Sequence, residues 1–262
     1  GLRAQMPPQP KLADVRHVPT FVRGRHEHRA GRWYTAPVSM STVYDTIHLT
    51  TGFHVPPLYR QMVADGVVRY GKSPAEWKQV WKERALTSPP ALMIAHAQVE
   101  WWLPEDMVNW DAPEHFDPAH KLLPFASTSS GDLWCWYQKG GEESVVLAPH
   151  NENGATHFAP DLEAFLLRHM IQAFAEMVED DGTDFTPAQR SEAARANVRT
   201  VTPYLNEGWV ALLEELAARP LVRDDEWDCL SLLNQDEAIT LIQTELDMPT
   251  LGETFPHFRL AR

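Results

Sequence analysis

The most informative pattern of hydrophobic and polar positions is the segment LWCWYQK, which starts at Leu133 and opens with an unbroken hydrophobic run. In an extended chain, Leu133, Cys135 and Tyr137 lie on one side, and Trp134 and Trp136 lie on the other. Bulky side chains therefore occupy both sides. The pattern predicts either a strand that is covered on both faces or a strand whose exposed aromatic face binds a ligand.

Two turns are expected around the strand that follows. Gly140 and Gly141 form a glycine pair of the kind that adopts the positive φ angles of tight hairpin turns. The apolar run at 144–147 is then the partner strand of the hairpin. Asn151-Glu152-Asn153-Gly154 is expected to form the next turn.

The apolar spacing changes to that of a helix after the second turn. Pro160 is expected in the first helical turn, where its missing N–H costs no hydrogen bond. Asp161 and Glu163 then place negative charge at the positive end of the helix dipole. The apolar residues that recur on one face are Leu162, Phe165, Leu166, Ala173, Phe174 and Met177.

Three further helices are predicted after residue 181. The first begins at the capping box Thr186-Pro187-Ala188-Gln189, the second follows Asn206, and the third follows Asn234. Each has one apolar face, so we expect the three to pack on the sheet domain. The expected fold class is α+β: a mostly antiparallel sheet flanked by helices, with an added C-terminal helical annex. The expected organisation is a basic arm at 1–35, an α+β domain at 36–181 and a helical extension at 182–262.

Short motifs occur in this chain in the order in which one known family has them. An expected helix at Val55-Pro56-Pro57-Leu58-Tyr59-Arg60 leads to the turn Asp65-Gly66. The later motifs are Leu123-Pro124-Phe125-Ala126, Gly131-Asp132-Leu133-Trp134-Cys135, Val145-Val146-Leu147 with His150, Phe158-Ala159, and Leu162-Glu163-Ala164-Phe165-Leu166. Together they resemble the SUKH superfamily over about residues 41–181. That superfamily includes a fungal regulator of cell-wall synthesis and many bacterial proteins that neutralise polymorphic toxins.

The resemblance implies a SUKH-like domain that binds another protein and performs no reaction. The chain departs from the family pattern in two places. About eighty residues follow Asp181, and the basic segment before Trp33 has no counterpart in the family.

The charge of the chain is unevenly distributed around a net value of −13. Residues 1–99 carry 13 Lys and Arg against 6 Asp and Glu, residues 100–185 carry 3 against 17, and residues 186–262 carry 7 against 13. An acidic central segment repels nucleic acid and attracts basic proteins, although solubility alone explains a modest negative charge. The arginines of 16–32 are expected to pair with the acidic domain.

Candidate catalytic and metal sites are few. The sequence contains no P-loop, dinucleotide fingerprint or G-x-S-x-G elbow. His150, Glu152 and His157 could bind a metal only if their turn closed around it. Cys135 and Cys229 are too few for a disulfide framework or a zinc cluster. We expect no enzymatic activity, no cofactor and no metal.

The favoured function is a cytoplasmic immunity protein that binds a cognate, basic toxin domain; no apolar run is long enough to span a membrane. One alternative is a scaffold or regulator of the same superfamily that binds a cellular partner. Another is a hydrolase or carbohydrate-binding domain that uses the aromatic strand face. The oligomeric state stays open. The residues expected to contact the partner are acidic side chains and one tryptophan with an acidic rim: Trp110, Glu142, Glu143, Glu152, Glu179, Asp180 and Asp181.

Overall fold

The computed structural model describes residues 40–71, 73–95, 98–176, 184–224 and 229–259. The basic arm at 1–35 and the predicted contact residues Glu179, Asp180 and Asp181 lie outside the described residues. In chain order the elements are α1 (Met40–Thr51), α2 (Pro57–Ala64), α3 (Pro74–Thr87), η1 (Met93–Ala95), β1 (Glu100–Trp101), α4 (Pro104–Val108), β2 (Lys121–Ser127), β3 (Leu133–Lys139), β4 (Glu142–Ala148), β5 (Ala155–Ala159), α5 (Leu162–Ala175), α6 (Pro187–Val201), η2 (Thr202–Tyr204), α7 (Glu207–Ala217), β6 (Val222–Asp224), β7 (Cys229–Ser231), α8 (Gln235–Glu245) and β8 (Thr254–Phe255).

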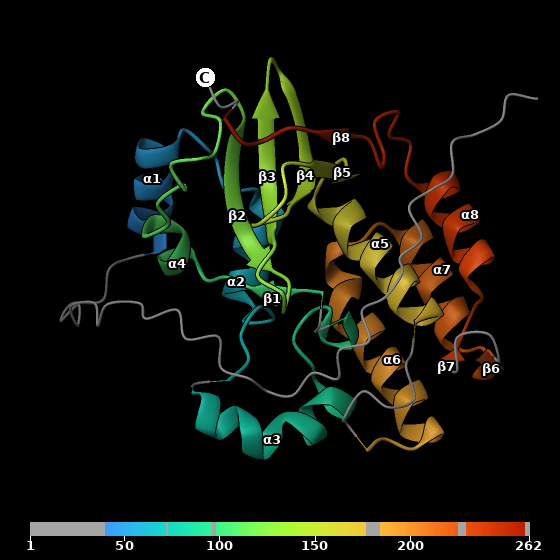
Figure 1. The fold of residues 1–262 in the computed structure, drawn as a ribbon. Coiled ribbons are helices and arrows are strands. Elements are labelled where there is room, and N and C mark those ends of the chain that lie inside the picture. The colour runs from blue at the N-terminus through green and yellow to red at the C-terminus, as the bar shows by residue number, and fades with distance from the viewer. Residues whose placement is uncertain (1–39, 72, 96–97, 177–183, 225–228, 260–262) are drawn as a thin grey trace, which may run out of the picture.

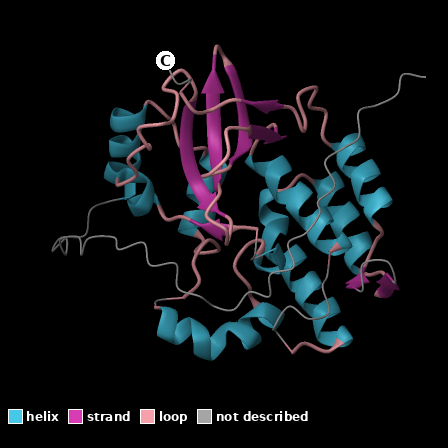
Figure 2. Ribbon diagram, viewed as in Figure 1, coloured by secondary structure: helices cyan, strands magenta, loops and turns pink. Residues whose placement is uncertain are grey.

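The described strands form one antiparallel sheet in the order β1-β2-β3-β4-β5-β8 and a small β6–β7 hairpin. In Figure 1 the helices α1 and α4 lie to the left of the strands and α5 to α8 lie to the right, and both groups contribute to the same large core. Figure 2 shows the same arrangement by secondary structure, with α3 apart from the sheet at the bottom of the view. The α+β class predicted from the sequence is confirmed. No helix among the described residues has both the length and the apolar character needed to cross a bilayer.

Strand β3 is covered on both faces, as one of the two sequence interpretations proposed. Trp134 and Trp136 belong to the large core that β3 shares with α2 and α5. Cys135 and Tyr137 belong to a second, smaller core on the opposite face, which we call the outer face. The loop before β2 and the chain around β8 cover the outer face with Phe116, Phe255 and Phe258. The aromatic strand face is therefore core, not an exposed binding surface.

Helix α5 is buried on almost every side, whereas the sequence predicted only one apolar face. It begins at Leu162 with Asp161 as its N-cap, and the Asp161 carboxylate accepts a hydrogen bond from the Ala164 N–H at 2.8 Å. Pro160 therefore lies before the helix, not in its first turn as predicted. The Asp161 carboxylate caps the first turn by accepting the Ala164 N–H, so α5 begins without a proline.

The three helices predicted after residue 181 are confirmed as α6, α7 and α8. They pack against α5 and against one another. The same part of the chain also supplies β8, which pairs with β5 and forms one edge of the sheet. This strand is only two residues long, so it carries too little alternation to be recognised in the sequence.

Candidate functional site

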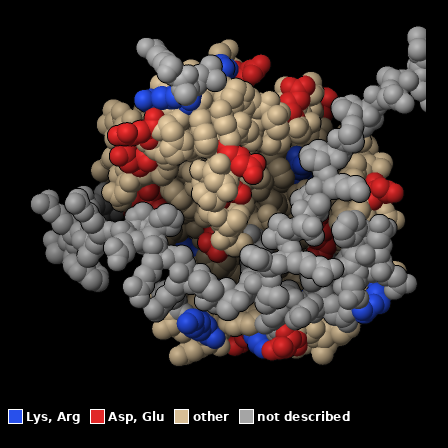
Figure 3. Space-filling view, in the orientation of Figure 1, with Lys and Arg blue, Asp and Glu red and all other residues tan. Residues whose placement is uncertain are grey.

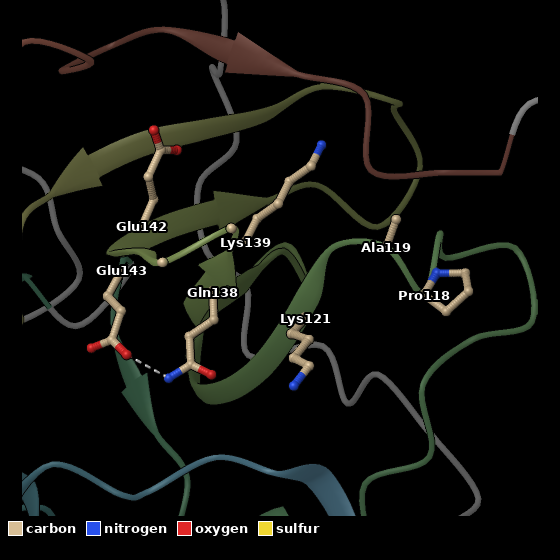
Figure 4. Close-up of a pocket in the computed structure, with 9 residues that line it drawn as sticks. Pro118, Ala119, Lys121, Gln138, Lys139, Glu142 and Glu143 are labelled. Carbon is tan, nitrogen blue, oxygen red and sulfur yellow. Dashed lines mark hydrogen bonds between the residues drawn. The ribbon is translucent and has the colours of Figure 1, made fainter.

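The tip of the β3–β4 hairpin presents two of the predicted contact residues. Gly140 and Gly141 form the turn with φ angles of +61° and +92°, which confirms the expected glycine turn. Side chains then alternate between the two faces of the hairpin. Figure 4 shows Glu142 and Lys139 pointing to one side, and Glu143 and Gln138 pointing to the other. Glu142 and Glu143 are both exposed, but they serve different surfaces.

A hollow of about 270 Å³ lies between the hairpin tip and the loop before β2. Its charged lining residues are Lys121, Lys139, Glu142 and Glu143, two of each sign (Figure 4). Lys139 and Glu142 also face each other across the strand pair. The charges in this hollow therefore balance, and it offers no acidic surface to a basic partner.

A larger hollow, the hairpin groove, lies between the hairpin and the first turns of α2 and α5, with a volume of about 340 Å³. Glu143, Asp161 and Glu163 stand in its wall, and neither lysine nor arginine is among its lining residues. The groove is therefore the hollow near the hairpin where negative charge gathers. Its lining residues are Phe53, His54, Pro56, Pro57, Leu58, Trp136, Tyr137, Gln138, Glu143, Ser144, Val145, Pro160, Asp161, Leu162 and Glu163.

Each of the three carboxylates is held in place by one of its two oxygens. Glu143 Oε1 accepts a hydrogen bond from Gln138 Nε2 at 2.8 Å, and Asp161 Oδ1 accepts the N-cap bond. Glu163 Oε1 accepts two bonds from Asn206, at 2.7 Å from its backbone N and 3.0 Å from its Nδ2. The second oxygen of each carboxylate accepts no bond from the described residues. These oxygens remain available to a cationic ligand.

The floor of the groove contains a buried donor without an acceptor. Trp136 is 6% exposed and stacks on Phe125, with ring centroids 4.7 Å apart. Its Nε1–H has no hydrogen-bond partner among the described residues. The Nε1 atom is shielded from solvent, so the unsatisfied donor costs about 1–3 kcal/mol inside the core and is not presented to a ligand. The groove therefore offers a ligand acceptors for a cation beside apolar lining residues.

The other predicted contact residues lie elsewhere. Glu152 is in the β4–β5 turn, at the far end of β4 from Glu142 and Glu143; at about 3.4 Å per residue the two ends of that strand lie roughly 20 Å apart. Trp110 is half-buried and packs edge-on against Phe116 with a centroid distance of 6.5 Å. In the face shown in Figure 3, Asp and Glu occur in separate groups across the surface. Of the predicted contact residues that the structure describes, only Glu143 lines the hairpin groove.

The sequence predicted that Asp161 and Glu163 place negative charge at the positive end of the helix dipole, and their position in the groove was missed. Asp161 caps α5, and Glu163 accepts the backbone N–H of Asn206 before α7. Their second role arises because β5 ends beside the start of β4, which brings the start of α5 close to Glu143. The only sequence signal was an Asp-x-Glu pair at a helix start following an acidic hairpin turn.

The histidines considered for metal binding do not converge. His150 Nδ1 lies 2.9 Å from Asp132 Oδ1 in an exposed pair, whereas His157 is buried with its Nδ1 3.0 Å from Ser144 Oγ. Among the described residues no three His, Cys, Asp or Glu side chains are placed to hold a metal ion.

Ser130 Oγ also donates to Asp132, at 3.3 Å. Asp132 therefore lies between the Ser130 hydroxyl and the His150 imidazole. A catalytic triad requires the imidazole between the hydroxyl and the carboxylate, so these three residues do not form one.

Replacing Asp161 with alanine should lower the free energy of unfolding by about 1 kcal/mol, because the N-cap bond to Ala164 is lost. Urea unfolding monitored by circular dichroism measures the change. The matched control is Asp161→Asn, which retains an acceptor oxygen and should restore most of the loss. A stability unchanged in the alanine variant would contradict the capping role.

Comparison with models of known protein families, with curated proteins and with solved structures finds no match to this chain.

Proposed function

We propose that this chain is a cytoplasmic immunity protein of the kind that the SUKH resemblance implies, and that it binds a basic toxin domain through the hairpin groove. The proposal rests on one observation. Glu143, Asp161 and Glu163 line a single hollow that has no lysine or arginine in its wall, and each has one oxygen without a partner among the described residues.

The groove suits a basic side chain that belongs to a peptide segment. The aliphatic stem of an arginine or lysine packs on apolar floor residues such as Leu58, Trp136 and Val145. Its charged head donates charge-assisted hydrogen bonds to the carboxylates. One short basic segment therefore fills the groove and pairs with its unused carboxylate oxygens.

Charge also favours this choice of partner kinetically. The central segment at 100–185 carries 17 acidic against 3 basic residues, so it attracts a positively charged domain over distances of about a Debye length. Toxins that cut nucleic acid need a basic surface for the phosphates. Occupation of that surface would block substrate binding without any reaction by this chain.

The test is the variant Glu143→Lys, measured against toxin domains encoded beside the gene of this protein. We expect binding to weaken by at least about 30-fold, which corresponds to about 2 kcal/mol, and the variant to lose protection of cells that express the toxin. Glu143 is the best position, because among the described residues its side chain bonds only to Gln138 and its replacement removes no helix cap. Biolayer interferometry at low and high salt gives the rates.

The control is Glu214→Lys, which makes the same charge change at an exposed position of α7. It should change the association rate only slightly, because Glu214 is not among the groove residues. Equal weakening by both variants would show that net charge, not the groove, attracts the partner. If Glu143→Lys leaves affinity and protection intact, the groove is not the binding site.

A further inference from the structure

The chain after α8 crosses the outer face of the sheet as a strap, residues 252–259. In Figure 1 it runs across the upper end of the sheet, through β8, towards the end marked C. It is fastened to β5 by two backbone bonds of 2.9 Å, from the His157 N–H to the Glu253 carbonyl and from the Gly252 N–H to the His157 carbonyl. Further along, Phe258 forms an isolated bridge with Phe116 in the loop before β2.

A single asparagine fastens the strap to the β4–β5 turn. Asn153 Oδ1 accepts the backbone N–H groups of His257 and Phe258, at 2.8 and 2.7 Å. The His257 carbonyl in turn accepts the Asp117 N–H at 2.8 Å. His257 therefore sits where the strap meets both neighbouring loops.

The imidazole of His257 is fully buried in an environment that suits only its neutral form. Its Nε2 lies 3.1 Å from the Pro149 carbonyl oxygen, and because a carbonyl only accepts, Nε2 carries the proton. Its Nδ1 has no partner among the described residues. Phe116 and Phe258 pack against the ring, with centroids at 5.1 and 4.4 Å.

We infer that the strap is an acid-released latch: protonation of His257 at Nδ1 creates a buried cation with an unpaired N–H, and the strap leaves the outer face so that the imidazolium reaches water.

The titratable and charged groups around His257 favour release over a protonated, closed strap. On the loop before β2, His115 packs on Phe258 at 4.5 Å and His120 packs on Phe255 at 4.8 Å, so further imidazoles border the strap. Both lower the pKa of His257, after burial, which is the main cause, while the Pro149 bond opposes the shift. Arg259 of the strap adds a further positive charge and donates to the Phe116 carbonyl.

Carboxylates near the strap do not offset these groups. Asp117 Oδ1 accepts the Ala119 N–H, and Glu152 of the β4–β5 turn and Glu253 of the strap are exposed. None of these carboxylates bonds to the His257 ring, whose Nε2 pairs with the Pro149 carbonyl and whose Nδ1 has no partner among the described residues. On the sheet, Tyr137 is uncharged at neutral pH and burial raises its pKa further, whereas burial lowers the pKa of His157. Attraction between an imidazolium and the phenyl rings is weaker than the cost of its desolvation.

Release of the strap should precede unfolding of the protein. The strap contributes a two-residue strand and a few side chains, whereas the large core lies on the opposite face of the sheet. Segments with few buried contacts open locally at a lower free energy than the whole fold. The outer face beneath contains Cys135, which is fully buried and free. Its thiol therefore reports the opening.

The experiment measures the rate at which 4,4′-dithiodipyridine, a reagent that stays reactive in acid, labels Cys135 between pH 8 and pH 5. A Cys229→Ser background leaves a single thiol. At each pH the rate is divided by that of the urea-unfolded protein, which removes the intrinsic pH dependence of the reagent and the thiol. We expect this ratio to rise at least tenfold as the pH falls, while near-ultraviolet circular dichroism still reports a folded core. In His257→Gln most of this rise should be lost.

Three results would overturn the latch. The first is a ratio that stays flat in the parent, and the second is an equal rise in His257→Gln. If His257→Gln instead labels rapidly at every pH, a second measurement tests the latch: NMR follows the titration of the His257 ring in the parent protein. The latch requires that titration to coincide with the labelling transition, and a separation of more than one pH unit is the third result against it.

Discussion

Replacing Phe165 with alanine should lower the free energy of unfolding by about 3–5 kcal/mol, the largest effect we expect from one substitution. Phe165 is fully buried near the start of α5. Its ring contacts one aromatic ring from each of four other elements and one from α5 itself, with centroid distances of 4.5 to 6.0 Å. These partners are Trp101 of β1, Phe125 of β2, Trp134 of β3, Phe158 of β5 and His169 of α5 itself.

The loss has two sources. Alanine removes the transfer free energy of the ring, and it leaves a cavity that strands of an ordered sheet cannot fill by small shifts. Domains are stable by about 5–15 kcal/mol in total, so this one change removes a large part of the margin. Urea unfolding followed by tryptophan fluorescence measures it. Leu49→Ala is the control, because Leu49 is 83% exposed in α1 and its replacement should stay within about 0.5 kcal/mol.

Acidification should destabilise the protein through His169, by about 1.4 kcal/mol per pH unit below the ordinary histidine value of about 6.5. His169 is buried between Phe158 and Trp134, and its Nε2 has no partner among the described residues. Burial, and after it the positive charge of Arg168, lowers its pKa well below the ordinary value. The ring therefore stays neutral in the fold where the unfolded chain already binds a proton.

The sign of this effect follows from that difference. Above about pH 6.5 neither state is protonated and His169 imposes no penalty; as the pH falls, the unfolded state gains the proton and is favoured. The slope of unfolding free energy against pH between 7.5 and 5 measures the effect. His169→Gln should be less stable at pH 7.5 but should have a slope smaller by about 1.4 kcal/mol per unit. An unchanged slope in that variant would mean that other groups cause the acid sensitivity.

The sequence predicted those parts of the fold that depend on local periodicity. The alternation in β3 placed Trp134 and Trp136 on one face and Cys135 and Tyr137 on the other, because a strand has a period of two. The glycine turn and the helices after residue 181 followed from short signals of turn and cap residues. In each case the deciding residues lie within one element or beside it.

The groove and the strap could not be predicted, because each depends on residues that are far apart in the chain. Glu143 and Glu163 line one hollow only because β5 pairs with β4 and ends beside its start, where α5 begins. His257 becomes buried only because the chain returns after α8 to the outer face of a sheet that was complete, apart from its last strand, at residue 159. The spacing of residues within one element does not reveal either of these tertiary contacts.

The late position of β8 has a consequence for synthesis of the protein on the ribosome. About 95 residues separate the end of β5 from β8, and at about 5–20 residues per second their translation takes roughly 5–20 s. During that interval the edge of β5 has no partner strand, and the apolar residues of the outer face lack the cover that Phe255 and Phe258 supply. A nascent chain in this state is open to strand pairing with its neighbours, so chaperone demand should peak between the emergence of β5 and that of β8.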